Sequence, residues 1–293
     1  MLTSVGKPRV QLLAAVELLK PVTWFPPMWA LACGVVSSGV PAAGNEWRIL
    51  IGILLAGPLV CAASQAMNDW CDRHVDAINE PDRPIPSGRL PGTTGLAIAW
   101  AWSLLSVAVA ALLGPVVIGA TLIGLALAVA YSAPPLRLKR NGWWGNAACG
   151  VSYEGLAWVT GAALMLGRVP DAPVLMLALL YSIGAHGIMT LNDFKSIEGD
   201  ERSGIRTLPV QLGCYRAAVT ASWFMLVPQV GVVALLLALG RPIHATIIVV
   251  LIAMQYAAVR VLLEDPRRRA VWYSAVGVLF FVAGMMVSAL AVR

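Results

Sequence analysis

Long apolar segments separated by short polar ones dominate the chain and predict an all-α, polytopic membrane protein. A helix that crosses the hydrocarbon core of a bilayer needs about 20 apolar residues, and nine segments are near that length. They are residues 22–40, 50–70, 95–113, 115–132, 143–165, 171–192, 216–238, 242–262 and 270–291. No polar stretch is long enough for a soluble domain. We therefore expect residues 1–293 to form a single transmembrane domain of nine helices.

Composition and charge agree with this pattern. Hydrophobic residues make up 59% of the chain and charged residues 12%, against about 25% charged in ordinary soluble domains. The net charge of +6 does not indicate a nucleic-acid partner, because the basic residues lie in short loops between apolar spans. Such residues are better interpreted as topology signals, and the expected surroundings are membrane lipids.

The distribution of Lys and Arg predicts the orientation of the spans. If the N-terminus is cytoplasmic, that side carries all but four of the 21 basic residues, including Lys7, Arg9 and Lys20. The four on the other side are Arg48, Arg168, Arg241 and Arg293. Basic loops stay on the cytoplasmic side of a membrane, so the N-terminus and the polar loops discussed below are expected there. With no transit peptide before the first span, a bacterial inner or intracytoplasmic membrane is favoured over a plastid.

Residues 68–76 have a high density of carboxylates for a chain with only 15 acidic residues. Asp69, Asp72 and Asp76 follow Asn68 at the end of the second span. Helical residues three, four and seven apart share a face, so these carboxylates repel one another unless cations lie among them. Mg²⁺ takes oxygen ligands and commonly binds carboxylates together with substrate phosphates. The spacing therefore predicts a metal-diphosphate site at the membrane surface.

A second acidic segment repeats the first. The repeat covers residues 68–89 and 192–213, and its matching residues are Asn192, Asp193 and Asp200. Ser196 stands where the first copy has its middle aspartate, so a second metal would depend on Asp193, Asp200 and Glu198. Both copies end an even-numbered span on the same side of the membrane. They are expected to close around one diphosphate from opposite sides.

Basic residues near the two motifs complete the predicted site. The candidates for binding the diphosphate are Arg83, Arg137, Lys139, Lys195 and Arg206. A diphosphate leaves readily once its charge is neutralised by metal ions and cations. If it is attached to an allylic isoprenoid, its loss produces a delocalised carbocation that a nucleophile captures. For Arg83 and Arg206, a simple role in membrane topology is the alternative.

Three segments resemble the UbiA superfamily of intramembrane prenyltransferases. They are Asn68-Asp69-x-x-Asp72-x-x-x-Asp76, the second motif Asn192-Asp193…Asp200, and Tyr131-Ser132-Ala133-Pro134-Pro135. Within that superfamily, residues 76–88 and 192–200 resemble the chlorophyll synthase branch, and residues 19–29 resemble its bacteriochlorophyll synthases. The resemblance covers nearly the whole chain.

The resemblance implies an enzyme with nine transmembrane helices that binds Mg²⁺ and a prenyl diphosphate. The five aspartates of the two motifs would bind the metal, and Asn68, Asn192, Tyr131 and the basic residues would bind substrate. The branch implies esterification of the propionate of a chlorophyllide or bacteriochlorophyllide with a geranylgeranyl or phytyl group. The sequence leaves open which tail and ring are used, and whether other pigment-biosynthesis proteins bind.

Two intramembrane residues and two other functions stay open at this stage. Glu154 is a candidate acceptor-binding residue, because acids within a membrane span are usually functional; a structural hydrogen bond is the alternative. His186 could bind the central magnesium of a chlorin or simply pack in the protein. A quinone precursor or haem could replace the pigment as acceptor. A transporter or pigment-binding protein could also use acidic loops, but transporter repeats place substrate near the midplane.

Overall fold

The computed structural model describes residues 8–293 of the chain. Lys7, which contributes to the predicted orientation, and the N-terminus itself lie outside these residues, as does the side chain of Arg9. Within the described part the fold is all-α, as the apolar pattern predicts, and extended pairing is confined to one bridge between Asn141 and Arg206.

The first eight helices contain the first acidic motif and the walls of the candidate site. They are α1 (Pro8–Leu18), α2 (Phe25–Ser37), α3 (Glu46–Leu54), α4 (Ala62–Asn79), α5 (Thr94–Ala111), α6 (Pro115–Ser132), α7 (Gly142–Gly150) and α8 (Ala157–Leu166). Two π-helical segments, η2 (Leu55–Cys61) and η4 (Val151–Leu156), join α3 to α4 and α7 to α8. Short 3₁₀ turns lie at η1 (Pro21–Thr23) and η3 (Leu138–Arg140).

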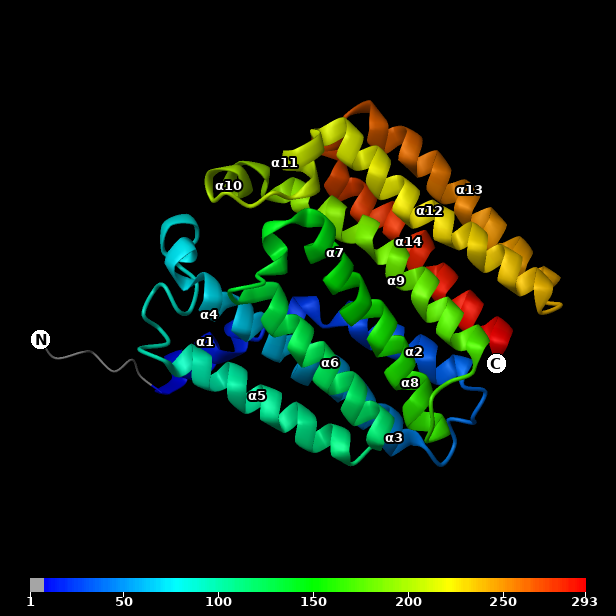
Figure 1. The fold of residues 1–293 in the computed structure, drawn as a ribbon, viewed down its shortest axis with the longest axis horizontal. Helices are drawn as coiled ribbons and strands as arrows, with labels where there is room; N and C mark the ends of the chain where they lie inside the picture. Colours follow the sequence, from blue (N-terminus) through cyan, green and yellow to red (C-terminus); the bar gives the residue numbers. More distant parts are fainter. Residues whose placement is uncertain (1–7) are drawn as a thin grey trace, which may run out of the picture.

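The remaining helices begin with the one that leads into the second motif. They are α9 (Ala172–Asn192), α10 (Ile197–Arg202), α11 (Leu208–Leu212), α12 (Cys214–Ala238), α13 (Pro242–Glu264) and α14 (Pro266–Val292), with the 3₁₀ turn η5 (Asp193–Lys195) after α9. In Figure 1, α9, α12, α13 and α14 lie along one side of the bundle and α3 to α6 along the other. The short helices α10 and α11 and the loop after α4 lie at the same end.

Seven of the nine predicted spans correspond to described helices that are long and apolar enough to cross a membrane. The other two are shorter or interrupted. The first corresponds to α2, which has 13 residues, and the fifth to α7, η4 and α8 in succession. The second span also begins earlier than predicted, because α3, η2 and α4 form one run over Glu46–Asn79. The count of nine therefore remains a prediction.

Small residues allow the short helix α2 to pack closely against α8. A Cβ at Gly34 would lie 2.0 Å from the Trp158 carbonyl oxygen, and one at Gly161 would lie 2.0 Å from the Leu31 carbonyl oxygen. Backbones can approach this closely only where no side chain intervenes. The core continues from Trp158 through Tyr181, whose ring stacks on the indole at 5.5 Å. This packing fixes α8 and α9 beside α2.

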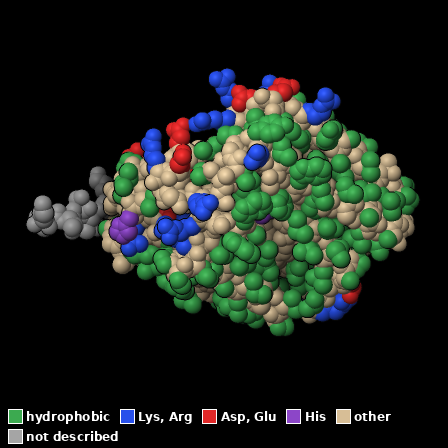
Figure 2. Space-filling view, turned by 45° about the horizontal axis from the view of Figure 1, so that its top comes forward, with side chains coloured by type: hydrophobic (Ala, Val, Ile, Leu, Met, Phe, Trp, Pro, Cys, Tyr) green, Lys and Arg blue, Asp and Glu red, His purple; other side chains and the backbone are tan. Residues whose placement is uncertain are grey.

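Charged side chains gather at the end of the bundle that contains the polar loops. Figure 2 shows Lys, Arg, Asp and Glu grouped at the left and top of one face, while hydrophobic side chains cover most of the remainder. Large apolar side chains such as Leu104, Val22 and Ile243 are more than half exposed, which is the surface expected of a protein whose solvent is lipid. The candidate site lies at the charged end.

Candidate active site

The two acidic motifs meet in one polar cavity of about 580 Å³ at this end of the bundle. The candidate residues that line it are Asn68, Asp72, Asp76, Arg83, Tyr131, Arg137, Lys139, Asp193, Lys195 and Asp200. Six acidic and six basic residues line it in total. The first motif enters on the last turns of α4 and the second on η5 and α10. Segments more than 100 residues apart thus form one site, as the repeat suggests.

Asp69 and Asp76 of the first motif are bound by cations in the structure. The Nζ of Lys20 lies 2.6 Å from Oδ1 of Asp69, and Arg83 donates to the same oxygen at 3.4 Å. Arg83 also donates to Oδ2 of Asp76 at 2.9 Å. Both carboxylates are buried, and a buried charge requires a partner of this kind. Asp76 lines the cavity, whereas Asp69 is not among its lining residues.

Asp72 points toward the loop that follows α6. Arg137 donates to its Oδ1 at 2.9 Å, and Lys139 donates to its Oδ2. Lys139 is largely buried, and burial lowers the pKa of this lysine although the charge of Asp72 opposes the shift. Arg137 adopts the left-handed conformation with φ of 37°, which turns the chain so that both cations face α4.

The second motif contains fewer ion pairs. Asp193 accepts a hydrogen bond from the side-chain amide of Asn146 at 3.2 Å, and Asp200 accepts one from the Ser196 hydroxyl at 2.7 Å. Ser196 thus supports its neighbouring acid in place of providing a third carboxylate. Burial raises the pKa of Asp200, and the hydrogen bond from Ser196 opposes this shift.

The chemistry of the donors fits a hard divalent cation, although the carboxylates do not converge in this conformation. Within residues 8–293, no three His, Cys, Asp or Glu side chains come together as a metal-binding group. One oxygen is nevertheless free: Oδ2 of Asp69 is buried and has no hydrogen-bond partner among the described residues. With Asp72, Asp76, Asp193 and Asp200 around the cavity, carboxylate oxygens are available from two sides.

Besides Asp69, four of the sequence-based candidates lie outside the polar cavity. Asn192 is exposed, and its amide contacts only the Met189 sulfur at 4.0 Å among the described residues. The side chain of Arg206 is also exposed, and its backbone instead binds the segment before α7, with its carbonyl accepting from the Gly142 N–H at 2.8 Å. Glu154 is buried in η4 and lines neither the polar cavity nor the apolar cavity described below.

His186 is the fourth of these candidates outside the polar cavity. Its ring stacks on Phe224 with centroids 4.1 Å apart, and its Nε2 lies 3.2 Å from the Trp143 carbonyl oxygen. The side chain is buried and lines neither the polar cavity nor the apolar cavity described below. Its Nδ1 has no partner among the described residues. This is the environment of a packed histidine.

Two contact residues were not identified from the sequence. In the sequence Lys20 indicates only the orientation of the spans, yet in the structure it makes the shortest contact to Asp69. Its position immediately before Pro21, where the chain turns into η1, offered a weak signal. Asn146 binds Asp193 and also donates to the Thr190 hydroxyl at 3.1 Å. As an amide within an apolar span it could have been found, because polar groups are costly there.

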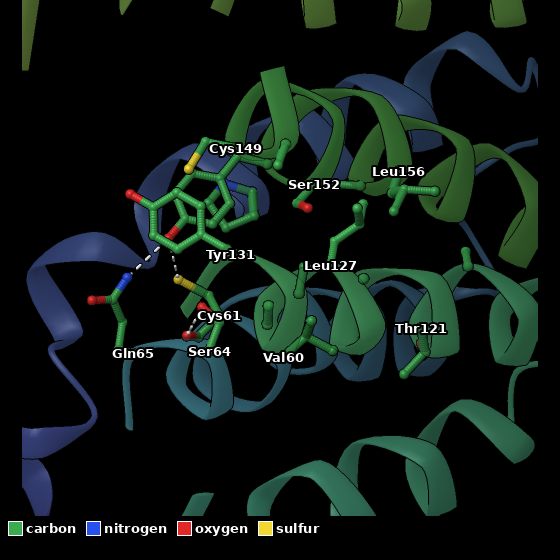
Figure 3. A pocket seen from close by; sticks show the side chains of 18 of the residues that line it. Val60, Cys61, Ser64, Gln65, Thr121, Leu127, Tyr131, Cys149, Ser152 and Leu156 are labelled. Carbon is green, nitrogen blue, oxygen red and sulfur yellow. Dashed lines mark hydrogen bonds between the residues drawn. The ribbon is translucent and has the colours of Figure 1, made fainter. Parts of the chain in front are cut away.

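An apolar cavity of about 200 Å³ continues from the polar one into the bundle. Asn68 and Tyr131 line both cavities. From these two residues the apolar cavity runs between three walls. The first wall is formed by α4 and η2, the second by α6, and the third by α7, η4 and α8. Figure 3 shows Val60, Thr121 and Leu127 on one side and Ser152 and Leu156 across the space. A charged group at the membrane surface could therefore be bound together with a hydrocarbon tail.

Comparison with known proteins identifies the family. Residues 20–287 match the UbiA prenyltransferase family. The chain is 53% identical over 293 residues to the bacteriochlorophyll synthase 33 kDa chain of Rhodobacter capsulatus, with 99% of this chain and 95% of that protein covered. It is 40% identical to the chloroplastic chlorophyll synthase of Arabidopsis thaliana, covering 94% of this chain and 73% of that protein.

The fold has the same relatives among solved structures. A UbiA homolog from Archaeoglobus fulgidus, solved bound to DMAPP and Mg²⁺, superposes with a TM-score of 0.73 at 20% identity. The match covers 94% of this chain and 99% of that one. The two acidic motifs, the helical bundle and the sequence match agree, and the chain belongs to the UbiA prenyltransferase family.

Proposed function

We propose that the protein transfers a geranylgeranyl or phytyl group from its diphosphate to the propionate carboxylate of a bacteriochlorophyllide or chlorophyllide a, with Mg²⁺. The observation that carries the donor half is the continuity of the two cavities, which meet at Asn68 and Tyr131. The diphosphate would occupy the polar cavity and the tail the apolar one. The bacteriochlorophyll and chlorophyll synthases among the relatives support the acceptor half.

The residues of the polar cavity suit release of a diphosphate. When bound there, Mg²⁺ held by the aspartates of the two motifs would neutralise the phosphate oxygens and act as a Lewis acid. Arg137, Lys139 and Lys195 would donate hydrogen bonds to the remaining oxygens. The bond between the allylic carbon and the bridging oxygen breaks, and the leaving diphosphate takes the electron pair.

The second half of the reaction needs no strong base. A propionate is ionised at neutral pH, so its oxygen attacks the allylic carbocation directly and forms the ester bond. The cavity lining accordingly includes no histidine among the described residues. Transfer to a quinone precursor or haem would use the same donor site, and it is the acceptor assay that separates these reactions. For Glu154 and His186 we favour structural roles, because neither residue lines the polar or the apolar cavity.

We further propose that residues 1–293 act as one transmembrane domain whose polar cavity faces the cytoplasm. The basic loops that surround this cavity support that orientation. The proposed location is a bacterial inner or intracytoplasmic membrane, where a lipid-soluble tail and a pigment are both available. Association with other pigment-biosynthesis proteins would shorten the path of the pigment between enzymes.

The test uses purified protein in detergent with Mg²⁺, geranylgeranyl diphosphate and either bacteriochlorophyllide a or chlorophyllide a. Esterified pigment and released diphosphate are both measured, and the same assay is run with Asp72→Ala. We expect product with one of the pigments and its loss in the variant. Diphosphate release without esterified pigment would retain the donor site and refute the acceptor. Absence of both would refute the proposed enzyme activity.

A further inference from the structure

The apolar cavity is long and follows the helices into the bundle. On α6 its lining runs from Tyr131 at the polar end to Ala120 at the deep end. At a rise of 1.5 Å per residue this stretch spans about 16 Å. On the facing wall the lining runs from Asn68 to Leu55, again at increasing depth along one continuous helical run. The cavity is thus deep enough for the charged end and the far end of a tail to be recognised by different residues.

The cavity narrows at Gly124. A Cβ at this position would lie 3.7 Å from Cγ1 of Val60 and 4.0 Å from Cδ1 of Leu156. These atoms belong to the other two walls of the cavity, on η2 and η4. The three walls of the cavity therefore come close together at Gly124, and even a Cβ there would make van der Waals contact with both of the others. Because Gly124 is part of the cavity lining, a larger side chain at this position would have to extend into the open space of the cavity.

The depth of Gly124 can be compared with the length of prenyl chains. It is seven residues from Tyr131 along α6, which is about 10 Å. A fully extended covalent chain gains about 3.5 Å for every three bonds. Each isoprene unit adds four bonds and hence about 5 Å. A two-unit chain thus ends near Gly124, whereas the third and fourth units of a longer chain have to pass it to reach Ala120.

We infer that Gly124 sets the length of prenyl chain that the enzyme accepts. This inference rests on the proposed function, since it requires the tail to occupy the apolar cavity. The absence of a side chain at Gly124 admits the third and fourth isoprene units into the deep part of the cavity. A branched side chain there blocks the passage but leaves the first two units and the diphosphate site unchanged. Donor selectivity then shifts from geranylgeranyl toward geranyl diphosphate.

The test compares Gly124→Leu with Gly119→Leu. Gly119 lies on the same helix, and a Cβ there would meet no atom within 4 Å, so its variant controls for the added bulk and apolarity. Binding is measured without acceptor, as the rise in Tm that geranyl or geranylgeranyl diphosphate produces in the presence of Mg²⁺. Turnover is measured with both donors. In enzymes generally, a difference of one methylene group in a hydrophobic pocket changes the selectivity between two substrates by about 10- to 200-fold.

We expect the ratio of geranylgeranyl to geranyl kcat/KM to fall at least tenfold in Gly124→Leu and to stay within twofold in Gly119→Leu. An unchanged ratio in Gly124→Leu, with both donors still raising Tm, would refute the inference alone. If neither donor raises the Tm of the unmodified protein, the donor assignment fails and the inference fails with it.

A second pair of variants covers the case in which Gly124→Leu does not fold. Gly124→Ala adds only a Cβ at van der Waals distance and should reduce the ratio in the same direction by a smaller factor. Adding Leu156→Ala removes the side chain on the opposite wall and should restore the ratio. Loss of function without recovery in the double variant would contradict a steric role for Gly124.

Discussion

Replacing Lys20 with methionine tests the contact that links the segment before α2 to the first acidic motif. In the structure Nζ of Lys20 lies 2.6 Å from Oδ1 of Asp69. The only other cation on this carboxylate, among the described residues, is Arg83 at 3.4 Å. Asp69 is 2% exposed, and its second oxygen has no hydrogen-bond partner within residues 8–293. In Lys20→Met a buried carboxylate therefore depends on one long contact.

The expected magnitude follows from this environment. A hydrogen bond to a charged group contributes about 1.5–3 kcal/mol. The lower value applies here, because the Lys20 side chain is 24% exposed and water can replace part of the interaction. If the loss of this contact raises the activation free energy by about 1.5 kcal/mol, kcat/KM decreases roughly tenfold. Residues that orient metal ligands commonly affect activity by about 10- to 100-fold, so a tenfold loss is at the low end of that range.

The assay measures kcat/KM for prenyl transfer as a function of Mg²⁺ concentration. Arg73→Met is the matched control, since Arg73 stacks over the Trp70 ring at 4.2 Å and removing it also deletes one cation beside the first motif. The kcat/KM of this control should stay within about twofold of that of the unmodified protein. If Lys20 acts through Asp69, then Lys20→Met should cost little more in an Asp69→Asn background. Equal losses in both backgrounds would show that Lys20 acts independently of Asp69 and refute this reasoning.

Three further predictions concern single residues. Burial raises the pKa of Asp200, so the charged form of this side chain destabilises the folded state. The variant Asp200→Asn should therefore raise Tm at pH 7 while abolishing transfer. The gain in Tm should shrink as the pH falls through the raised pKa, because the carboxyl group of the unmodified protein is then neutral as well. An unchanged Tm at pH 7 would contradict this. The pair between Glu17 and Arg89 at 2.6 Å is half exposed, so Glu17→Gln should reduce stability by less than about 1 kcal/mol in denaturant unfolding. His186→Leu should lower Tm through lost stacking on Phe224 yet keep kcat within twofold; a selective loss of kcat would instead favour pigment ligation.

The convergence of the two motifs was predictable because both copies end an even-numbered span on the same side of the membrane. Helical geometry was less informative: the spacing of Asp69, Asp72 and Asp76 predicts a shared side of one helix, but the structure divides them between partners. Asp72 faces Arg137 and Lys139, whereas Asp69 faces Lys20 and does not line the cavity. Side chains three or four residues apart share one side of a helix but still point in different directions. Which cation each of these carboxylates meets is decided by residues far away in the sequence.

Residues in the repeat show where alignment by pattern is insufficient. Asn192 occupies the position equivalent to Asn68, yet Asn68 donates to the Ser132 hydroxyl at 3.4 Å at the mouth of both cavities, whereas Asn192 is exposed. The reason is that α4 continues to Asn79, while the helix at the second motif ends at Asn192 and is followed by a 3₁₀ turn. No periodicity in the sequence reveals that the helix continues after the first asparagine and stops at the second.

The segments η2 and η4 were equally hidden from the sequence. Residues 55–61 and 151–156 lie inside segments that are apolar enough overall to be predicted as regular spans, so hydropathy alone predicts a continuous α-helix. In the structure both are π-helical and both contribute to the lining of the apolar cavity. A π-helical turn widens the helix locally and is frequent at functional sites. The position of the cavity between these two segments is therefore a property of the three-dimensional structure.

The charge balance of the polar cavity explains why the described residues form no preassembled metal-binding group there. Six acidic and six basic residues line it, and the aspartates of the first motif are already paired with neighbouring cations. A metal ion alone would have to displace Arg137 and Lys139 from Asp72, and a diphosphate alone would have to displace Asp72 from the same cations. If both arrived together, each displaced group would gain a new partner, since the carboxylate could bind the metal and the cations could bind phosphate oxygens. Because a buried charge without a partner is costly, we expect the site to favour the metal-diphosphate complex over either component.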